Sequence, residues 1–564
     1  MRRSSLFTRR RRDAIRANKH SRLECSVYYR NDRQIVCVSV DARKRTSRTS
    51  QKKMRRRISG SVLSVLVFLL SSHLRADDAG FRPIFDGQSL SGWEAPEPEF
   101  WSVEDGAITG RSTPKMPCQR NQYLTWARGT IDDFELKLKF RISGSPKANS
   151  GIQIRAAIEP DGHAVGYQAD IDVAGNWRGA LYDEKTDRRA LAKPGQHVSI
   201  ELDGKRNSTS LAESRHDFKV DDWNDYHITC AGPKITLKIN GKTTAVVVDE
   251  EKAHRDLWGR LALQLHSGPP MTIQFKDIQL KRLPLTDRRK KIVLVAGHPS
   301  HGSGQHEHNA GIKLLTRRLQ ELDGVIATSY HDNGWPEDST AFDNANGMVF
   351  YADGGRGHPV NKHLEKVEAL TARGVGMMCI HYGVEVPRGE IGSRFQKWIG
   401  GYYEDRYSSN PHWDAELRVH TDHPVGRGVE PTSVHDEWYF NIRFRNEMNG
   451  VTSILEATPS DKTRARNGYP PEPYPHIIEA SGRSETLMWA VEREDGGRGV
   501  GFTGGHWHRN WAIDAQRRVV LNAMVWMAGG VVPQGGVESD PVTEEELNRD
   551  LDKKGEMVRV KVPK

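Results

Sequence analysis

Histidine and acidic side chains gather in the second half of the sequence, at points where short apolar segments end. Four histidines follow the apolar segment 292–296, namely His298, His301, His306 and His308. His381 comes directly after the apolar segment 375–380, and His506 follows a further predicted strand near the end of the chain. Ligand sites of open α/β sheets lie beyond the carboxyl ends of the strands, so this topology would bring the side chains together.

These imidazoles have two interpretations. Imidazole binds Zn²⁺ and other divalent transition metals, whereas loop histidines also cap helices and bond to the backbone. No pair has a spacing diagnostic of a metal site, so the sequence leaves a divalent cation and its identity open. Asp436 and Glu437 could support the histidines, cap an element or be surface charges. The predicted site of the second half comprises His301, His306, His381, Asp436, Glu437 and His506.

A second set of polar side chains shares one face of the strands predicted in the first half. Side chains alternate between the two faces of a strand, so Gln153 and Arg155 point away from Ile152 and Ile154. By the same rule the other members of this face are Gln168, Asp170, Asp172, Gln264 and His266. Together with tryptophans that stack on sugar rings, such a face suits a polar ligand. The alternative is a solvated sheet face with a few ion pairs.

The elements that carry this face form an all-β domain by their pattern. From residue 81 to about residue 283, apolar residues recur with period two, as Phe134, Leu136 and Leu138 do between charged residues. Asn240-Gly241 favours a tight hairpin turn. Because no long amphipathic helix interrupts the pattern, we predict a jelly roll over residues 80–283.

Strands and helices alternate in the second half, after the polar segment 282–291 that marks the domain boundary. The apolar strand 292–296 is followed by segment 309–322, in which apolar residues form one helical stripe. This order predicts a parallel, doubly wound α/β sheet of flavodoxin-like type over residues 289–532. The charged tail, residues 533–564, is expected to be loosely attached.

The motifs of the first half resemble those of the 3-keto-disaccharide hydrolase family, which has a concanavalin A-like fold. They read FDG to GW at 85–93, NSGIQIR at 149–155, GYQADI at 166–171 and LQLHSG at 263–268. The resemblance implies cleavage of glycosides already oxidised at C3. A C3 ketone acidifies the hydrogen at C2, so one positioned base can trigger loss of the C1 substituent, and hydration follows.

The resemblance also implies roles for the polar face. His266 or Asp170 would be the base, and Arg155 or a metal would hold the developing enolate oxygen. The sugar would be bound by Gln153, Gln168, Gln264 and Asp172. The competing enzyme hypothesis is a conventional glycosidase in which Asp170 and Asp172, two residues apart on one face, flank the glycosidic oxygen.

The second half resembles the ThuA-like, trehalose-utilisation family, whose fold is similar to that of class I glutamine amidotransferases. The motifs are SHG at 300–302, HEH at 306–308, HP at 423–424, DEWY at 436–439 and GH at 505–506 with Trp511. Amidotransferases place a nucleophilic cysteine on the turn after a central strand. Cys379 is expected within its strand, with His381 near the turn, and a buried thiol is inert. Amide hydrolysis is therefore not predicted.

Three functional hypotheses follow. The first is an exported, carbohydrate-active hydrolase that cleaves 3-keto-glycosides or disaccharides, with the first domain catalytic. The second is a non-catalytic carbohydrate-binding module joined to a ThuA-like scaffold. The third makes the second domain the catalyst, through a divalent metal held by His306, His381 or His506. The expected partner in each case is a carbohydrate.

Charge and leader pattern bear on partners and location. Residues 1–76 hold 21 Lys and Arg against 4 Asp and Glu, a local net charge of +17. The whole chain has a net charge of +10, so the remaining residues carry −7, which argues against nucleic acid as a partner. Residues 54–76 resemble a signal peptide, with arginines, an apolar stretch and Ala76 at the cleavage point. We therefore expect a periplasmic or extracellular protein without stable membrane insertion. Residues 1–53 are interpreted as a basic extension upstream of the true start at Met54.

The three cysteines beyond residue 76, Cys118, Cys230 and Cys379, cannot form a disulfide framework.

Overall fold

The computed structural model describes residues 79–212, 217–465 and 473–563. The basic extension 1–53 and the signal peptide 54–76 lie outside the described residues. Within the described ranges, no helix has the length and apolar character that a membrane crossing requires.

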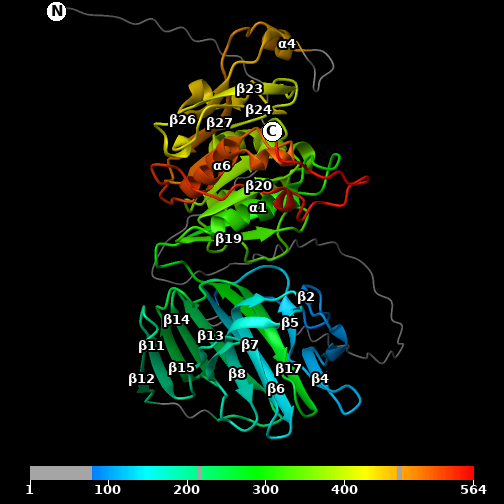
Figure 1. Cartoon of the computed structure of the whole chain (residues 1–564), viewed down its shortest axis with the longest axis vertical. Helices are drawn as coiled ribbons and strands as arrows, with labels where there is room; N and C mark the ends of the chain where they lie inside the picture. Colours follow the sequence, from blue (N-terminus) through cyan, green and yellow to red (C-terminus); the bar gives the residue numbers. More distant parts are fainter. Residues whose placement is uncertain (1–78, 213–216, 466–472, 564) are drawn as a thin grey trace, which may run out of the picture. The chain divides into compact units, whose positions relative to one another are not determined.

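The first half folds into two β-sheets, as the alternation predicts. One sheet has the strand order β12-β11-β15-β14-β13-β6-β17-β4-β3, with β1 paired to β17, and the other has the order β10-β9-β8-β7-β16-β5-β2 (Figure 1). The strands of the first sheet are β1 (Arg82–Pro83), β3 (Trp101–Glu104), β4 (Ala107–Ser112), β6 (Phe134–Gly144), β11 (Gln196–Ile200), β12 (Arg206–Ser210), β13 (Asn224–Ala231), β14 (Lys234–Ile239), β15 (Lys242–Asp249) and β17 (Met271–Arg282). The strands of the second sheet are β2 (Trp93–Glu94), β5 (Gln122–Trp126), β7 (Asn149–Ile158), β8 (Ala164–Asp172), β9 (Leu181–Glu184), β10 (Arg189–Ala192) and β16 (Arg260–Leu265).

One apolar core lies between these two sheets. It contains Leu136 and Phe140 of β6, Ile152 of β7 and Leu263 of β16, each completely buried. Because Ile152 and Leu263 point into this core, their neighbours Gln153 and Gln264 point to the opposite face of the second sheet. The predicted jelly-roll architecture is confirmed.

The second half is built on a sheet with the order β19-β18-β20-β21-β28-β27-β26-β23-β24. Its strands are β18 (Lys290–Ala296), β19 (Val325–Tyr330), β20 (Gly347–Tyr351), β21 (Gly376–Ile380), β23 (His412–Val419), β24 (Thr432–Glu437), β26 (Val451–Ala457), β27 (Glu485–Glu492) and β28 (Arg498–Phe502). The first five strands in the sheet order pair in parallel, and the remaining pairs are antiparallel. A separate short pair joins β22 (Gly401–Tyr402) to β25 (Arg443–Phe444). The parallel part has the flavodoxin-like order, which reverses between β18 and β20.

Helices cover both faces of this sheet. On one face α1 (His308–Gln320) and α6 (Asp514–Met527) share an apolar core with Leu294, Val349 and Phe502. On the other face α2 (Leu364–Thr371) and α3 (Glu390–Ile399) pack against Val293, Phe350 and Cys379. Two four-residue helices, α4 (Asp461–Arg464) and α5 (Pro475–Ile478), follow β26. The doubly wound α/β fold is therefore confirmed.

The expectation that the charged tail attaches loosely is wrong. Val537, Val542 and Val560 are buried in the same core as α1 and α6. A short helix, α7 (Glu544–Leu547), begins with a capping box between Thr543 and Glu546. The tail is charged, but its few apolar residues are placed where they pack on the domain, and its charges pair with α1, as in the contact of Arg318 with Glu546.

Candidate metal centre

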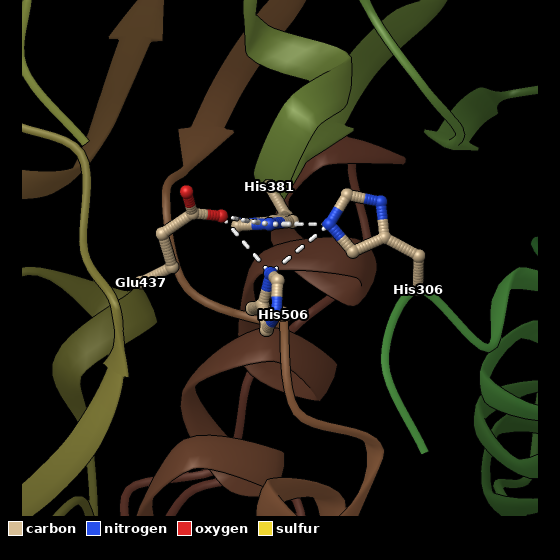
Figure 2. Close-up of side chains that lie close together, drawn as sticks. All are labelled: His306, His381, Glu437 and His506. Atoms are coloured by element: carbon tan, nitrogen blue, oxygen red, sulfur yellow. Dashed lines mark hydrogen bonds and ion pairs between the residues drawn. The ribbon is translucent and has the colours of Figure 1, made fainter. Parts of the chain in front are cut away.

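Three histidines and one glutamate converge in the second half (Figure 2). His306 Nε2 lies 3.1 Å from His381 Nε2 and 3.1 Å from His506 Nδ1. Glu437 Oε2 lies 3.3 Å from His381 Nε2 and 2.9 Å from His506 Nδ1. One ligand atom from each of the four residues lies within 4.8 Å of the others, so a single cation could contact them all. We call these four residues the four-residue centre.

The strand order explains why these side chains meet. His306 lies between β18 and α1, His381 follows β21 directly, and His506 follows β28. All three therefore extend from the carboxyl ends of parallel strands, at one edge of the sheet. Glu437 is the last residue of β24, in the antiparallel part of the sheet.

The outward nitrogen of each imidazole faces a hydrogen-bond acceptor. His306 Nδ1 lies 2.9 Å from Asp353 Oδ1, and His381 Nδ1 lies 2.9 Å from the carbonyl oxygen of Thr503. His506 Nε2 lies 3.2 Å from Gln305 Oε1. A neutral imidazole carries one proton, so each ring donates outward and directs its remaining lone pair into the centre. This is the arrangement that metal-bound histidines adopt.

The glutamate is oriented in the same way. Asn410 Nδ2 donates to Glu437 Oε1 over 2.9 Å, which leaves Oε2 directed at the histidines. The pKa of Glu437 is held well below its ordinary value: burial would raise it, but hydrogen bonds and charges from His381 and His506 outweigh burial. The carboxylate is therefore ionised and available to a cation.

Two histidines of the four-residue centre have shifted pKa values, and the causes of the two shifts differ. The pKa of His306 is strongly lowered, mainly by burial and then by the adjacent histidines, so its ring stays neutral. Burial alone would also lower the pKa of His381, but the hydrogen bond and charge of Glu437 raise it above 6.5. Without a cation, His381 therefore holds a proton more readily than His306.

Asp436 supports the centre without entering it. Its carboxylate accepts hydrogen bonds from the backbone N–H groups of Gly505 and His506, at 2.8 and 3.1 Å, and from Asn510 Nδ2 at 3.0 Å. The hydroxyl of Tyr351 donates to the carbonyl oxygen of Gly505. These bonds fix the turn that carries His506.

His301 lies beside the centre. Its ring stacks on that of His306, with ring centroids 3.7 Å apart, and its pKa is lowered mainly by burial. His301, His306 and Asp353 also have ligand atoms within reach of one ion. This second group shares His306, whose Nδ1 donates its proton to Asp353. A cation bound there would have to replace that proton and break the hydrogen bond, so we assign the cation to the four-residue centre.

A polar cavity opens next to the four-residue centre. Its volume is about 890 Å³, and it reaches both His306 and Glu437. Its other lining residues include His301, Tyr382, Glu385, Arg388, Tyr403, Asp405 and Tyr439. Tyrosine rings with charged groups between them are suited to a sugar, which presents both apolar ring faces and hydroxyls. Tyr439 reaches the centre itself, with its hydroxyl 3.4 Å from His381 Nε2.

Part of the predicted polar face of the first half forms a connected network. Gln153 Nε2 donates to Gln168 Oε1 over 2.5 Å, and Gln168 Nε2 donates to Asp170 Oδ1 over 2.7 Å. Gln264 Nε2 donates to the hydroxyl of Tyr123 over 3.1 Å. The Oε1 atoms of Gln153 and Gln264 are buried and have no hydrogen-bond partner among the described residues. Burial raises the pKa of Asp170 well above its ordinary value and so favours the protonated form of this carboxyl.

Arg155 does not join that network, which corrects its assignment as a catalytic residue. Its φ of 52° and the register shift between Gln153 and Ala157 interrupt the alternation of β7. The guanidinium instead pairs with Asp133 at 2.8 Å and donates to the carbonyl oxygens of Asp132 and Gly232 at 2.7 and 2.8 Å. With 1% of its surface exposed, Arg155 has a structural role.

Asp172 and His266 lie at the ends of their strands. The carboxylate of Asp172 accepts the backbone N–H groups of Asn176 and Arg178, at 2.9 and 2.8 Å, and so closes a turn. Both carboxylate oxygens of Asp172 are thus hydrogen-bonded to the backbone, and its predicted roles in substrate binding and beside Asp170 stay predictions. His266 is half-buried, and its Nδ1 lies 2.6 Å from the carbonyl oxygen of Ser267. Among the described residues its Nε2 has no contact of this kind, and the assignment of His266 as the base stays a prediction.

Cys379 lies within β21 and is fully buried. Burial raises the pKa of its thiol above the ordinary value of 9.0. A neutral, enclosed thiol cannot act as an amidotransferase nucleophile.

Sequence reasoning places one of the three groups that orient the histidines: Asp353 follows a predicted strand and lies at this sheet edge by the strand-end rule. The other two, Gln305 and the carbonyl oxygen of Thr503, have no signal in a single sequence. Glu385 and the tyrosines of the cavity were also missed, because they approach the centre from loops.

Comparison with known families divides the chain in the order that the motifs predict. Residues 80–281 match the family described as the 3-keto-alpha-glucoside-1,2-lyase-like domain. Residues 292–527 match the ThuA family, described as trehalose utilisation. The two predicted resemblances are therefore confirmed, and the descriptions of both matched families concern carbohydrates. A search of curated proteins finds no match.

Solved structures match parts of the chain at low sequence identity. A Parabacteroides distasonis protein described provisionally as a glycosyl hydrolase is 15% identical, with a TM-score of 0.26, covering 37% of this chain and 95% of its own. The carbohydrate binding module CBM66 from Bacillus subtilis is 12% identical, with a TM-score of 0.24, covering 34% of this chain and 95% of its own. A ThuA-like protein from Parabacteroides merdae is 17% identical, with a TM-score of 0.32, covering 46% of this chain and 99% of its own.

Proposed function

We propose that this chain is a metal-dependent, carbohydrate-active enzyme that cleaves 3-keto-glycosides, with the four-residue centre as its catalytic site. The observation that carries the proposal is the convergence of three imidazole lone pairs and one carboxylate oxygen in the second half. The substrate class rests on the two matched families, whose descriptions concern a 3-keto-glucoside and trehalose.

The residues present fit a divalent transition metal. His306, His381, His506 and Glu437 offer nitrogen and oxygen ligands of the kind that Zn²⁺ accepts, and hydrogen bonds already orient each of them. Three lone pairs facing one another would be unfavourable unless a cation or a proton lay between them. A bound divalent cation would polarise a carbonyl oxygen and so acidify the C–H group beside a ketone.

Glu385 is the residue best suited to move the proton. It lines the cavity that contains Glu437 and His301. Burial, assisted by the charges of Asp405 and Glu437, raises the pKa of Glu385 to about 7. A carboxyl with that pKa can accept a proton from C2 of a 3-keto sugar and later return it at neutral pH. Loss of the C1 substituent would follow, and water would complete the hydrolysis.

The cavity supports the substrate class. Ligand pockets for small molecules span about 300–1,000 Å³, and this cavity of about 890 Å³ has room for a disaccharide. Tyr382 and Tyr439 keep their phenolic protons, because burial raises both pKa values. Their hydroxyls can therefore donate hydrogen bonds to sugar oxygens.

A second candidate places cleavage on the first half. The network of Gln153, Gln168 and Asp170 favours it, because a protonated Asp170 could donate to a leaving oxygen. His266 would then be the base. Asp170 itself is not suited to that task, and Arg155 is not available to hold an enolate oxygen.

We further propose that the protein is exported, on the pattern of residues 54–76 alone. A periplasmic or extracellular location would place the enzyme where oxidised glycosides arrive from outside the cell.

The test uses a nitrophenyl 3-keto-glucoside, whose cleavage releases a coloured phenol. Cobalt-loaded wild-type protein is compared with His381→Ala and Asp170→Asn. We expect His381→Ala to lower kcat/KM at least 100-fold and Asp170→Asn to change it less than threefold.

The opposite pattern would transfer catalysis to the first half. Binding of the intact glycoside in calorimetry without turnover by any form, metal-loaded or not, would contradict both enzyme proposals and leave a carbohydrate-binding module. Thermal unfolding of each variant serves as the folding control.

A further inference from the structure

The C-terminal segment, residues 533–563, contacts the loops that carry two histidines of the four-residue centre. Val558 N donates to Ser303 Oγ over 3.0 Å, just before His306. On the other loop, His508 Nε2 donates to the carbonyl oxygen of Leu547 over 3.1 Å, two residues after His506. The segment lies beyond residue 527, where the ThuA family match ends.

Glu307 joins the segment to the His306 loop. This glutamate is completely buried. Its Oε1 accepts the backbone N–H of Gly304 over 2.8 Å, and its Oε2 accepts the backbone N–H of Asp552 over 3.0 Å. Lys554 Nζ lies 3.4 Å from Oε1 and supplies the counter-charge that a buried carboxylate requires.

Lys554 also contacts the backbone of the ligand loop directly. Its ammonium donates to the carbonyl oxygens of Gln305 and His306, at 2.5 and 2.9 Å. Only 5% of the Lys554 side chain is exposed. Charge-assisted bonds of this kind are stronger than neutral ones, particularly where water is excluded.

The peptide that Lys554 holds serves two ligands of the centre. His306 is a ligand itself and adopts a φ of 45°, which a non-glycine residue keeps only where its surroundings impose it. Gln305 Oε1 faces His506 Nε2 and so sets the direction of a second ligand. A shift of this peptide would therefore displace two of the three imidazoles.

We propose that the C-terminal segment is a strap that positions the metal ligands, and that Lys554 is its positioning residue. The inference rests on the proposed metal centre and assigns a role to a part of the chain outside the family match. Lys554 neither contacts substrate nor binds the cation. It acts through the backbone of Gln305 and His306.

The test compares Lys554→Met with Lys313→Met in the full chain. Methionine keeps most of the length of lysine but removes the ammonium. Lys313 of α1 pairs with Asp550 of the C-terminal segment at 3.1 Å, and Arg317 also contacts Asp550. Lys313→Met therefore removes an equal charge from the contact between α1 and the segment, while Arg317 keeps the segment attached. Cobalt affinity and the visible Co²⁺ spectrum are measured, together with hydrogen–deuterium exchange of residues 303–309 in metal-free protein.

We expect Lys554→Met to weaken cobalt binding about 10–100-fold, the range found when partners behind metal ligands are removed. Its Co²⁺ spectrum should change and exchange at 303–309 should rise, while Lys313→Met should stay within twofold of wild type in affinity. Unchanged affinity and exchange in Lys554→Met would overturn the strap. If wild type binds no cobalt, the proposed function fails, and the exchange data alone then decide whether the strap holds the loop.

Discussion

At the scale of single residues, the ability of the four-residue centre to bind a cation depends on which ring nitrogens carry protons. The outer nitrogens of His306, His381 and His506 face Asp353, Thr503 and Gln305, so the inner nitrogen of each ring offers a lone pair when the ring is neutral. His306 and His381 also adopt φ values of 45° and 53°. Non-glycine residues in this region carry a cost of about 1–3 kcal/mol and cluster at functional sites. Geometry that is both strained and fully hydrogen-bonded favours a binding role over a chance meeting of loop histidines.

The proton on His381 predicts opposite pH dependences for metal binding and for metal-free stability. The folded pKa of His381 is raised above 6.5, so its stabilising contribution is complete below pH 6.5 and is lost as the pH rises through the folded value. Each unit of that shift is equivalent to about 1.4 kcal/mol. A cation needs the neutral ring, so affinity should rise over the same pH interval.

Urea unfolding of metal-free protein and cobalt titration between pH 6 and 9 test this pair of trends. In His381→Gln the ring is gone, and the difference in unfolding free energy between wild type and variant should shrink as the pH rises. A difference that stays constant over this interval would show that His381 holds no extra proton.

At the scale of elements, regular alternation was predictable and its interruptions were not. Period two correctly placed Gln153, Gln168 and Gln264 on the face opposite Ile152 and Leu263. It failed at Arg155, because one residue with positive φ shifts the register of β7 and redirects the side chain to Asp133. A single sequence shows no glycine or proline there to announce the bulge.

Two loops of the second half must pass very close to each other for the centre to form. A Cβ added at Gly354 would lie 2.1 Å from the carbonyl oxygen of Tyr382 and 2.6 Å from that of Glu385. Gly354 follows Asp353, and Tyr382 follows His381, so this contact sets the distance between the loops after β20 and β21. Both obstructing atoms belong to the backbone and cannot turn aside.

We therefore expect Gly354→Ala to separate Asp353 from His381, to lower cobalt affinity more than tenfold and to destabilise the protein by about 1–3 kcal/mol. Gly357→Ala is the matched control, because a Cβ there meets nothing within 4 Å. Cobalt titration and urea unfolding of both variants measure the two effects. Equal affinities in the two variants would mean that the loop contact does not set the geometry of the centre.

At the scale of the whole molecule, the sequence predicted the architecture of each half and the edge of the α/β sheet at which the histidines gather. Both follow from local periodicity and strand order. His306, His381 and His506 were found because each follows a strand. The attachment of the tail was not found, since Lys554 reaches Glu307 across more than two hundred residues of chain. The charge of the tail suggested an end exposed to solvent, and only the fold shows that Lys554 has a buried partner.

The two halves have separate apolar cores, one between the sheets of the jelly roll and the others on the faces of the α/β sheet. Separate cores predict two unfolding transitions rather than one. All four residues of the centre belong to the second half, so a bound cation should stabilise that half alone. At a free metal concentration 100 times the Kd, the gain is about 2.7 kcal/mol.

Calorimetry with zinc or cobalt, and again after chelation, measures this effect. We expect one transition to move up in temperature with metal and down with chelator, and the other to stay in place. In Glu437→Gln the centre loses its negative charge, so the mobile transition should respond much less. Because Gln keeps the size of Glu and Asn410 can still contact it, a remaining full response would show that the cation binds elsewhere. Movement of both transitions together would instead show that the halves unfold as one unit, so that metal bound in the second half also stabilises the jelly roll.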